Sequence, residues 1–212
     1  MQVRTRHTPT FGVARLQLAP GETVRADYAA LLATSYGVVV DARVRGGSRT
    51  RVRPTTFTAP AEGGWVDLAP SAPGDLYVLE LDGMSGWCLA KGGVLAATAT
   101  VQLEPQWPGF RALFGTELGF LEHVSGAGPL VLAACGAVDL ISLEPGEMIT
   151  IEPGYLLAYH DHLQCRLRAV SQSLPQSVRT GEGLILDFAG PGQVLTQTRN
   201  PRAFSTWLDA AR

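Results

Sequence analysis

His160 and His162 are the residues whose type and spacing most directly suggest chemistry. On a β-strand, residues two apart share a face, so both imidazoles could bind one metal ion, with Asp161 pointing away. A metal centre needs at least a third ligand, for which His123 and Glu122 are the candidates. The pair therefore leaves a metal-dependent small-molecule enzyme open as an alternative function.

Other catalytic patterns are weaker. His123 and Ser125 lie close in sequence, with Asp139 or Asp187 available to orient the imidazole, but a triad is defined by geometry rather than by residue types. Gly-x-Gly occurs at 126–128, 181–183 and 190–192 without the strand-to-helix context of a phosphate loop. We predict no catalytic residues and no cofactor.

An arginine-rich hairpin is predicted from the alternation of residues 38–45 and 49–53 around Gly46, Gly47 and Ser48. A three-residue loop would place Asp41 opposite Arg53 and gather the arginines on one face. That face would be solvated, would contact another subunit, or would bind an anion such as RNA or an anionic lipid. The candidate anion-binding residues are Arg43, Arg45, Arg49, Arg51 and Arg53.

An apolar loop follows at residues 105–115, where four large hydrophobic side chains lie in a turn-rich segment. Such a loop either closes the end of a β-barrel or forms a surface that contacts another subunit or a membrane. The candidate interface residues are Trp107, Phe110, Leu113 and Phe114.

Internal repetition indicates the elements that must position these residues. A leucine-alanine pair recurs at 32–33, 95–96 and 157–158, and a glycine at 64, 128 and 192. The same period links Phe57, Phe120 and Leu184. Units this short must share a core with their copies, so we predict one domain, residues 1–212, with approximate repeats 12–68, 69–134 and 135–200.

The composition predicts an all-β fold with a barrel- or sandwich-like body. The chain has 212 residues with 24 Gly and 14 Pro, and 17% of its residues are charged, a mixture typical of short strands joined by tight turns. Residues 26–33 have a helical composition, but their counterparts at 152–158 contain Pro153 and Gly154, which favours turn plus strand. A short C-terminal helix is expected at 201–211, capped by Asn200.

Carboxylates follow three Pro-Gly turns, at Glu22, Asp75 and Glu147. Such side chains can accept hydrogen bonds from exposed backbone N–H groups of the turn. Because equivalent copies offer similar environments, we expect a structural role rather than acid-base catalysis.

The cysteine pattern, the hydropathy and the start of the chain each support an expectation. Cys88, Cys135 and Cys165 are odd in number and widely spaced, which favours buried thiols over a disulfide framework. No apolar run is long enough to span a membrane, and the first eleven residues lack the apolar core of a secretory signal. We expect a cytoplasmic location.

The repeat marks also resemble a known family. Residues 120–121 with 125–128, the run 143–147, the glycines of 181–184 and 190–192, and residues 197–199 are similar to the mitochondrial biogenesis family named for altered inheritance of mitochondria. The resemblance takes in Pro73-Gly74-Asp75 and residues 93–96 and covers roughly residues 12–208. It implies a β fold related to the tryptophan RNA-binding attenuation protein and assembly into oligomers. The arginine hairpin replaces the glycine-rich insert usual in relatives.

Together these observations favour a non-catalytic oligomeric scaffold or binding protein, with a trimer as the favoured oligomer. The alternatives are anion binding through the arginine hairpin and metal-dependent catalysis at His160 and His162.

Overall fold

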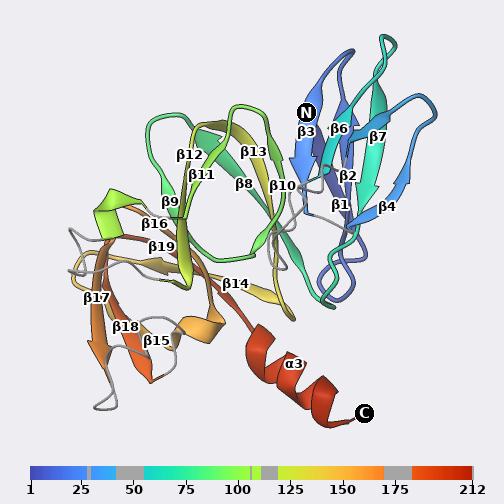
Figure 1. Cartoon of the computed structure of the whole chain (residues 1–212). Coiled ribbons are helices and arrows are strands. Elements are labelled where there is room, and N and C mark those ends of the chain that lie inside the picture. Colours follow the sequence, from blue (N-terminus) through green and yellow to red (C-terminus); the bar gives the residue numbers. More distant parts are fainter. Residues whose placement is uncertain (28–29, 42–54, 106, 111–118, 170–182, 212) are drawn as a thin grey trace.

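The described part of the chain consists mainly of antiparallel β-strands (Figure 1). This computed structural model describes residues 1–27, 30–41, 55–105, 107–110, 119–169 and 183–211. None of the helices within those ranges is long and apolar enough to cross a membrane. The predicted all-β fold class with a short C-terminal helix is confirmed.

The strands fall into three consecutive stretches, called here the first, second and third unit. After β1 (Gln2–Arg6), the first unit contains β2 (Val13–Leu18), β3 (Thr23–Ala26), β4 (Leu31–Thr34), β5 (Val39–Asp41), β6 (Thr55–Thr58) and β7 (Gly64–Leu68). The second contains β8 (Leu76–Asp82), β9 (Trp87–Ala90), β10 (Val94–Thr98), β11 (Gln102–Glu104), β12 (Leu121–Ser125) and β13 (Ala127–Ala133). The third contains β14 (Val138–Leu143), β15 (Met148–Ile151), the 3-10 helix η1 (Pro153–Tyr155), β16 (Leu156–His160), β17 (Gln164–Ala169), β18 (Leu184–Ala189) and β19 (Gly192–Gln197), and α3 (Pro201–Ala210) follows.

The same four strand pairings occur in each unit. In the first unit β2 and β4 pair with β7, and β3 and β5 pair with β6. In the second unit β8 and β10 pair with β13, and β9 and β11 pair with β12. In the third unit β14 and β16 pair with β19, and β15 and β17 pair with β18. On this recurrence we propose that repeats 12–68, 69–134 and 135–200 are structural copies.

Consecutive units are connected by one further strand pairing, called here a joint. β3 of the first unit pairs with β10 of the second, and β9 of the second pairs with β16 of the third. The resulting sheet orders are β1-β2-β7-β4, β5-β6-β3-β10-β13-β8, β11-β12-β9-β16-β19-β14 and β15-β18-β17. The first and last of these sheets lie at opposite ends of the molecule (Figure 1).

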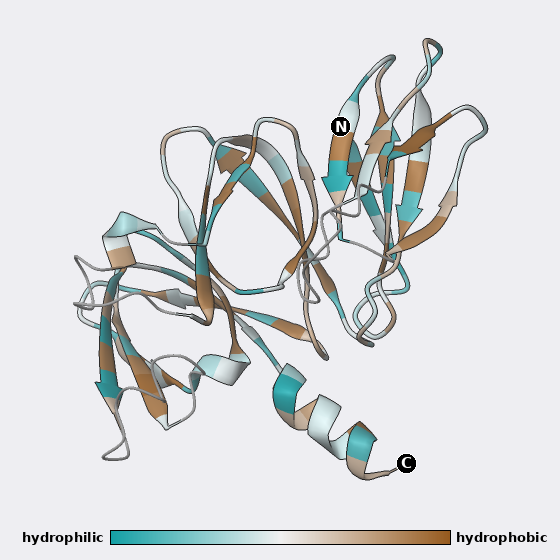
Figure 2. Cartoon of the chain, in the orientation of Figure 1, coloured by the Kyte–Doolittle hydropathy of each residue, from teal (hydrophilic) through white to brown (hydrophobic). Residues whose placement is uncertain are grey.

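The hydrophobic core is divided among the units and shared across the joints. One cluster combines first-unit side chains with Leu76, Leu95, Ala96 and Val131 of the second unit. A second combines second-unit side chains with Leu157, Ala158 and Leu195 of the third. Figure 2 shows the hydrophobic residues concentrated in the strands. Each unit therefore completes the core of the unit before it.

A β-bulge explains the recurring leucine-alanine pairs. The registers skip one residue in the third strand of each unit, namely Leu32 in β4, Leu95 in β10 and Leu157 in β16. Leu95 and Leu157 are each 1% exposed and belong to the core of the preceding unit, whereas Leu32 is 55% exposed. The pair thus marks the residue that inserts into the preceding unit, and the described residues contain no such unit before the first one.

The glycine marks also occupy matching register positions. In the three units the glycine lies opposite a leucine of the first strand, as Gly64 with Leu18, Gly128 with Leu81 and Gly192 with Leu143. The expected phase of Phe57 with Phe120 and Leu184 is wrong, because the ladders give Phe57 and Phe188 the matching positions in β6 and β18. Phe120 precedes β12, since the segment before that strand differs in length from its counterparts.

The C-terminal helix begins as predicted. The side chain of Asn200 accepts hydrogen bonds from the N–H groups of Arg202 and Ala203, at 3.0 and 3.4 Å. None of the residues of α3 is buried, and Trp207 is 63% exposed. The helix projects away from the sheets (Figure 1).

Candidate functional site

Three histidines and an aspartate meet at the joint between β9 and β16. His160 is the last residue of β16 and lies opposite Trp87 of β9. Asp161 and His162 follow in the turn toward β17, and His123 lies on the neighbouring strand β12. The second and third units therefore both contribute to this group, called here the histidine cluster.

Asp161 is the centre of the histidine cluster. Its Oδ2 accepts hydrogen bonds from Nε2 of His123 at 3.0 Å and from the N–H of Gly86 at 3.1 Å, while its Oδ1 lies 3.5 Å from Nδ1 of His160. Because a carboxylate only accepts hydrogen bonds, we assign the His123 proton to Nε2. Nδ1 of His123 is then a buried acceptor, and it has no hydrogen-bond partner among the described residues.

The backbone of Gly86 allows this close approach. An added Cβ at Gly86 would lie 2.3 Å from Nε2 of His123 and 2.6 Å from Oδ2 of Asp161. The N–H of Asp161 also donates to the carbonyl of Gly86 at 3.0 Å, so the turn is fixed to the second unit at two points. Any larger residue at this position would push the aspartate away from the histidine.

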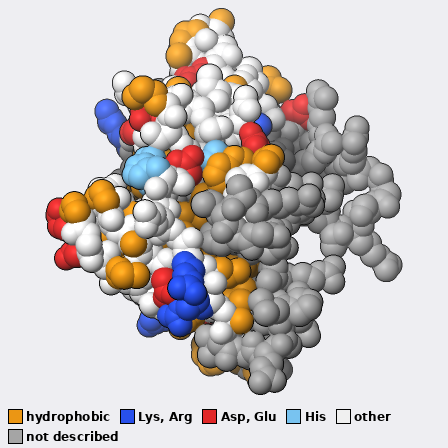
Figure 3. Space-filling view, turned by 90° about the vertical axis from the view of Figure 1, so that its left-hand side faces the viewer, with side chains coloured by type: hydrophobic (Ala, Val, Ile, Leu, Met, Phe, Trp, Pro, Cys, Tyr) orange, Lys and Arg blue, Asp and Glu red, His pale blue; other side chains and the backbone are white. Residues whose placement is uncertain are grey.

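Aromatic rings hold the imidazoles in place. Trp107 stacks on His123 with a centroid separation of 4.1 Å and an interplanar angle of 8°. Trp87 lies 5.0 Å from the ring of His160, which lies 3.9 Å from the ring of His162. On the surface, histidine side chains are visible beside an acidic side chain (Figure 3).

The electrostatics of the cluster suit metal binding. Burial lowers the pKa of His160, the nearby His162 lowers that pKa further, and Asp161 opposes both effects. His160 is therefore neutral at neutral pH, which is the form that binds metals. His160, Asp161 and His162 offer ligand atoms that all lie within 4.8 Å of one another, and two imidazoles with one carboxylate suit zinc or iron(II).

The third ligand differs from the sequence prediction. Asp161 does not point away but joins the histidines, because these residues occupy a turn rather than a continuous strand. His123 is engaged through its hydrogen bond to Asp161. Glu122 is 9% exposed and accepts from the N–H of Gly92 at 3.4 Å, and burial raises its pKa. Neither His123 nor Glu122, the two expected third ligands, belongs to the group formed by His160, Asp161 and His162.

His123 and Ser125 do not form a Ser-His-Asp triad with Asp187. The carboxylate that binds His123 is Asp161, whereas Asp187 accepts hydrogen bonds from Thr150 and Arg168. The imidazole of His123 is also covered by Trp107. Sequence reasoning missed Gly86, Trp87 and Trp107 as parts of this site, since nothing in their local sequence marks them.

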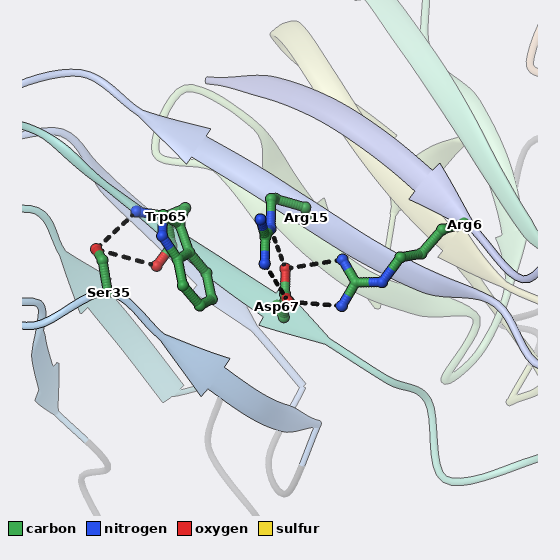
Figure 4. A network of polar contacts seen from close by, with 5 residues as sticks. All are labelled: Arg6, Arg15, Ser35, Trp65 and Asp67. Atoms are coloured by element: carbon green, nitrogen blue, oxygen red, sulfur yellow. Dashed lines mark hydrogen bonds and ion pairs between the residues drawn. The ribbon is translucent and has the colours of Figure 1, made fainter.

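A second polar network lies on the first unit (Figure 4). Asp67 is 2% exposed and accepts paired hydrogen bonds from Arg15, at 2.7 and 2.8 Å, and from Arg6, at 3.3 and 2.6 Å. The Arg15 guanidinium, followed by that of Arg6, lowers the pKa of Asp67 to about 2. Arg15 also lies over the ring of Trp65, 4.0 Å from its centroid.

The sequence contained a signal for this network. The register positions that match Asp67 are Val131 in the second unit and Leu195 in the third. An aspartate where two copies have an apolar residue needs a cationic partner. The carboxylate of Asp67 accepts four hydrogen bonds from two arginines of the same chain, so we assign the network a structural role.

The turn carboxylates behave structurally at two of three places. Oε2 of Glu22 accepts from the N–H of Ala19 at 2.8 Å, and Oε2 of Glu147 accepts from the N–H of Glu144 at 2.7 Å. Asp75 instead accepts from the N–H of the next residue, at 2.8 Å. Asp75 precedes β8, the first strand of its unit, whereas Glu22 and Glu147 precede β3 and β15, the second strands of theirs.

The arginine hairpin and half of the apolar loop fall outside the described residues. Arg43, Arg45, Arg49, Arg51 and Arg53 belong to residues 42–54, and Leu113 and Phe114 belong to residues 111–118. At the base of the hairpin Asp41 pairs with Thr56 rather than with the expected Arg53. Anion binding by these arginines stays a prediction.

The described half of the apolar loop packs inside the molecule. Phe110 is 1% exposed and belongs to the core cluster of the third unit. Trp107 contacts it edge to face at 5.3 Å and stacks on His123. These two side chains therefore serve the interior of this chain, which leaves Leu113 and Phe114 as the interface candidates of this loop.

The thiols are enclosed as predicted. Cys88 and Cys135 are buried, Cys165 is half-buried, and all three are free. Burial raises the pKa of Cys88 and of Cys165 to about 12. At neutral pH these thiols are protonated and poor nucleophiles.

A groove of about 660 Å³ is lined by α3 and by residues of the second and third units. Its lining includes Phe120, Pro153, Gln197, Thr206 and Trp207. Gln197 is held by the chain, since its Oε1 accepts from the N–H of Cys135 at 2.9 Å and its Nε2 donates to the carbonyl of Gly154 at 3.2 Å. The ionisable residues in the lining of the groove are Lys91, Glu152 and Arg202.

Comparisons with known proteins agree with this architecture. A crystal structure of a Streptococcus pyogenes protein has a TM-score of 0.77 at 23% identity and covers 100% of this chain and 99% of that one, which shows the same fold. An uncharacterised protein of Streptococcus pyogenes serotype M6 is 34% identical over 148 residues, or 68% of this chain and 58% of the relative. The family model described as mitochondrial biogenesis AIM24 matches residues 3–199. The chain belongs to the AIM24 family.

Proposed function

We propose that this protein is a non-catalytic scaffold that works as a homo-oligomer. The observation that carries the proposal is the exposure of large apolar side chains near the two ends of the row of units. Tyr36 is fully exposed, Leu32 is 55% exposed and Met148 is 70% exposed. Grouped apolar side chains on a surface mark contact sites.

The histidine cluster fits this proposal as a structural element. Its aspartate is engaged by His123 and Gly86, and tryptophans contact the rings of His123 and His160. The buried thiols are protonated at neutral pH. The described residues thus offer no activated nucleophile paired with a free base.

Light scattering after size-exclusion chromatography tests the proposal. We expect a stable oligomer, with a trimer as the favoured closed form, at about 100 µM protein, where an interface with a Kd near 10 µM is largely formed. A protein that stays monomeric at that concentration contradicts the scaffold proposal.

A second candidate function is the binding of a divalent metal ion by His160, Asp161 and His162. Their ligand atoms lie within 4.8 Å of one another, and His160 has a lowered pKa. We expect one zinc ion per chain by elemental analysis after dialysis against a zinc buffer, and loss of that zinc in His160→Ala. His7→Ala is the matched control, since His7 lies far away, in the turn after β1. Equal zinc in wild type and His160→Ala removes the candidate.

A further inference from the structure

We propose that copies of this chain join head to tail, with strand β4 of one copy pairing antiparallel to strand β15 of the next. This inference rests on the proposed oligomer and names the surface that forms it. The partner is a second copy of this chain, and the contact would be a third joint of the kind already found twice within the chain.

The internal joints supply the pattern. At each joint the third strand of one unit pairs with the second strand of the unit before it, as β10 with β3 and β16 with β9. β4 is the third strand of the first unit and β15 is the second strand of the third unit. They are the two members of this series left at sheet edges.

β4 and β15 cannot complete the joint within one chain. They belong to the first and last sheets, which lie at opposite ends of the molecule (Figure 1). A contact between different surfaces of two copies is heterologous, and it builds a ring or a filament according to whether the rotation closes.

Edge charges separate these two strands from the other edges. The described sheets have eight edge strands. Six of them carry charged residues, which oppose edge-to-edge association: Arg4 and Arg6 in β1, Asp41 in β5, Glu80 and Asp82 in β8, Glu104 in β11, Asp139 in β14, and Arg166 and Arg168 in β17. β4 reads LLAT and β15 reads MITI, with no charge in either.

The register of the new joint follows from the internal ones. The bulges align Ala33 with Ala96 and Ala158, whose joint partners are Ala26 and Leu89. The ladders to β6, β12 and β18 align those partners with Ile151. Ala33 would therefore lie opposite Ile151 of the next copy, and Thr34 opposite Thr150.

The exposed apolar side chains match this register. Leu32 would enter the core of the neighbouring third unit, as Leu95 and Leu157 enter the cores before them. Extending the pairing by two residues brings Tyr36 opposite Met148. The side chain of Tyr36 is fully exposed and that of Met148 is 70% exposed. A thioether beside an aromatic ring is a favourable contact.

In the described sheets β15 is an edge strand, so its backbone has groups without a sheet partner on the required side. The carbonyl of Glu147 accepts from the N–H of Gly190, beside β18. Because backbone groups alternate along an antiparallel strand, the N–H and carbonyl of Thr150 face away from β18. At the internal joints the same side is used, as in the bond from the N–H of Asp161 to the carbonyl of Gly86.

Complementation between two blocked variants tests the proposal. Leu32→Lys places a charge on β4, and Thr150→Pro removes an N–H that only the joint would use. We expect each variant to be monomeric alone, because each has lost one of its two ends. Their equimolar mixture should form a dimer and stop there, since each variant keeps the end that the other has lost.

Matched controls separate blocking from unfolding. Leu140→Lys puts the same charge on an exposed position of the edge strand β14, and Thr150→Val removes the same hydroxyl that binds Asp187 while keeping the N–H. Both controls should assemble like wild type. Circular dichroism spectra that match wild type confirm that the blocked variants are folded.

A disulfide between copies fixes the register. Thr34→Cys and Thr150→Cys, made separately and then mixed under oxidation, should give a disulfide-linked dimer, since paired residues of adjacent strands lie within disulfide range. Ser142→Cys, exposed on β14, replaces Thr150→Cys in the control mixture and should give none. A dimer of Thr34→Cys alone would mean a symmetric β4 contact and would overturn the head-to-tail model.

The outcomes also separate this inference from the scaffold proposal. If wild type is monomeric at about 100 µM, both fail. If wild type is oligomeric while Leu32→Lys and Thr150→Pro assemble unchanged, the joint between copies is wrong and the scaffold proposal stands.

Discussion

Asp67→Asn should destabilise the protein in a way that depends on pH. The pKa of Asp67 is lowered from 3.8 to about 2, chiefly by Arg15 and then by Arg6. A difference of nearly two pKa units corresponds to at most about 2.5 kcal/mol of stability. Because both arginines are more than a third exposed, we expect about 2 kcal/mol at neutral pH.

The sign follows from the direction of the shift. A carboxyl with a lowered pKa in the folded state stabilises the fold above its unfolded pKa, and that stabilisation is lost as pH falls toward the folded pKa. The difference in unfolding free energy between wild type and Asp67→Asn should therefore be constant from pH 7 to pH 5. It should fall to about half at pH 3.

Urea unfolding followed by tryptophan fluorescence at pH 7, 5 and 3 measures this difference. Asp139→Asn, on an exposed position of β14, is the control and should change stability little at any of the three values. Arg15→Gln should cost more than Arg6→Gln, since Arg15 contributes the largest effect on the pKa of Asp67. A gap that is the same at pH 3 as at pH 7 would refute the assignment of the stabilisation to the ionised carboxylate.

Three further outcomes are expected. Leu157→Ala should lower the unfolding free energy by about 2–5 kcal/mol in urea titrations. Leu32→Ala should change the unfolding free energy of dilute protein by less than about 0.5 kcal/mol. Similar losses in the two variants would contradict the difference in burial between these leucines. Gly86→Ala should lower the unfolding free energy by about 1–3 kcal/mol, because the added Cβ displaces His123 from Asp161. An unchanged melting temperature would count against this packing. Cys88, with a pKa of about 12, should react with a thiol reagent at pH 8 only after unfolding, so rapid labelling of folded protein would show that it is accessible.

The repeat marks predicted the strands because they reflect the geometry of the ladders. The leucine of each leucine-alanine pair is the bulged residue, and each spaced glycine holds the same register position. Such positions tolerate few residue types, so their spacing is visible in the sequence. The strand predicted in the second half of residues 26–33, despite their helical composition, is β4 (Leu31–Thr34).

The histidine cluster could be predicted only in part. The spacing of His160 and His162 predicted that the two imidazoles lie together, but it placed them on a continuous strand. The contact of Asp161 with His123 joins residues 38 positions apart in two different units. That contact depends on which strands meet at the joint, and the periodicity of one chain segment does not contain this information. Phe57 was placed in the wrong phase for a related reason, because the connections before β6, β12 and β18 differ in length.

The sharing of cores between units sets an order for folding during synthesis. Val131 belongs to the core cluster of the first unit, and Leu195 belongs to that of the second. Neither core can close until the ribosome has made the last strand of the following unit. We therefore expect a polypeptide that is cut at a unit boundary to be left with an open core.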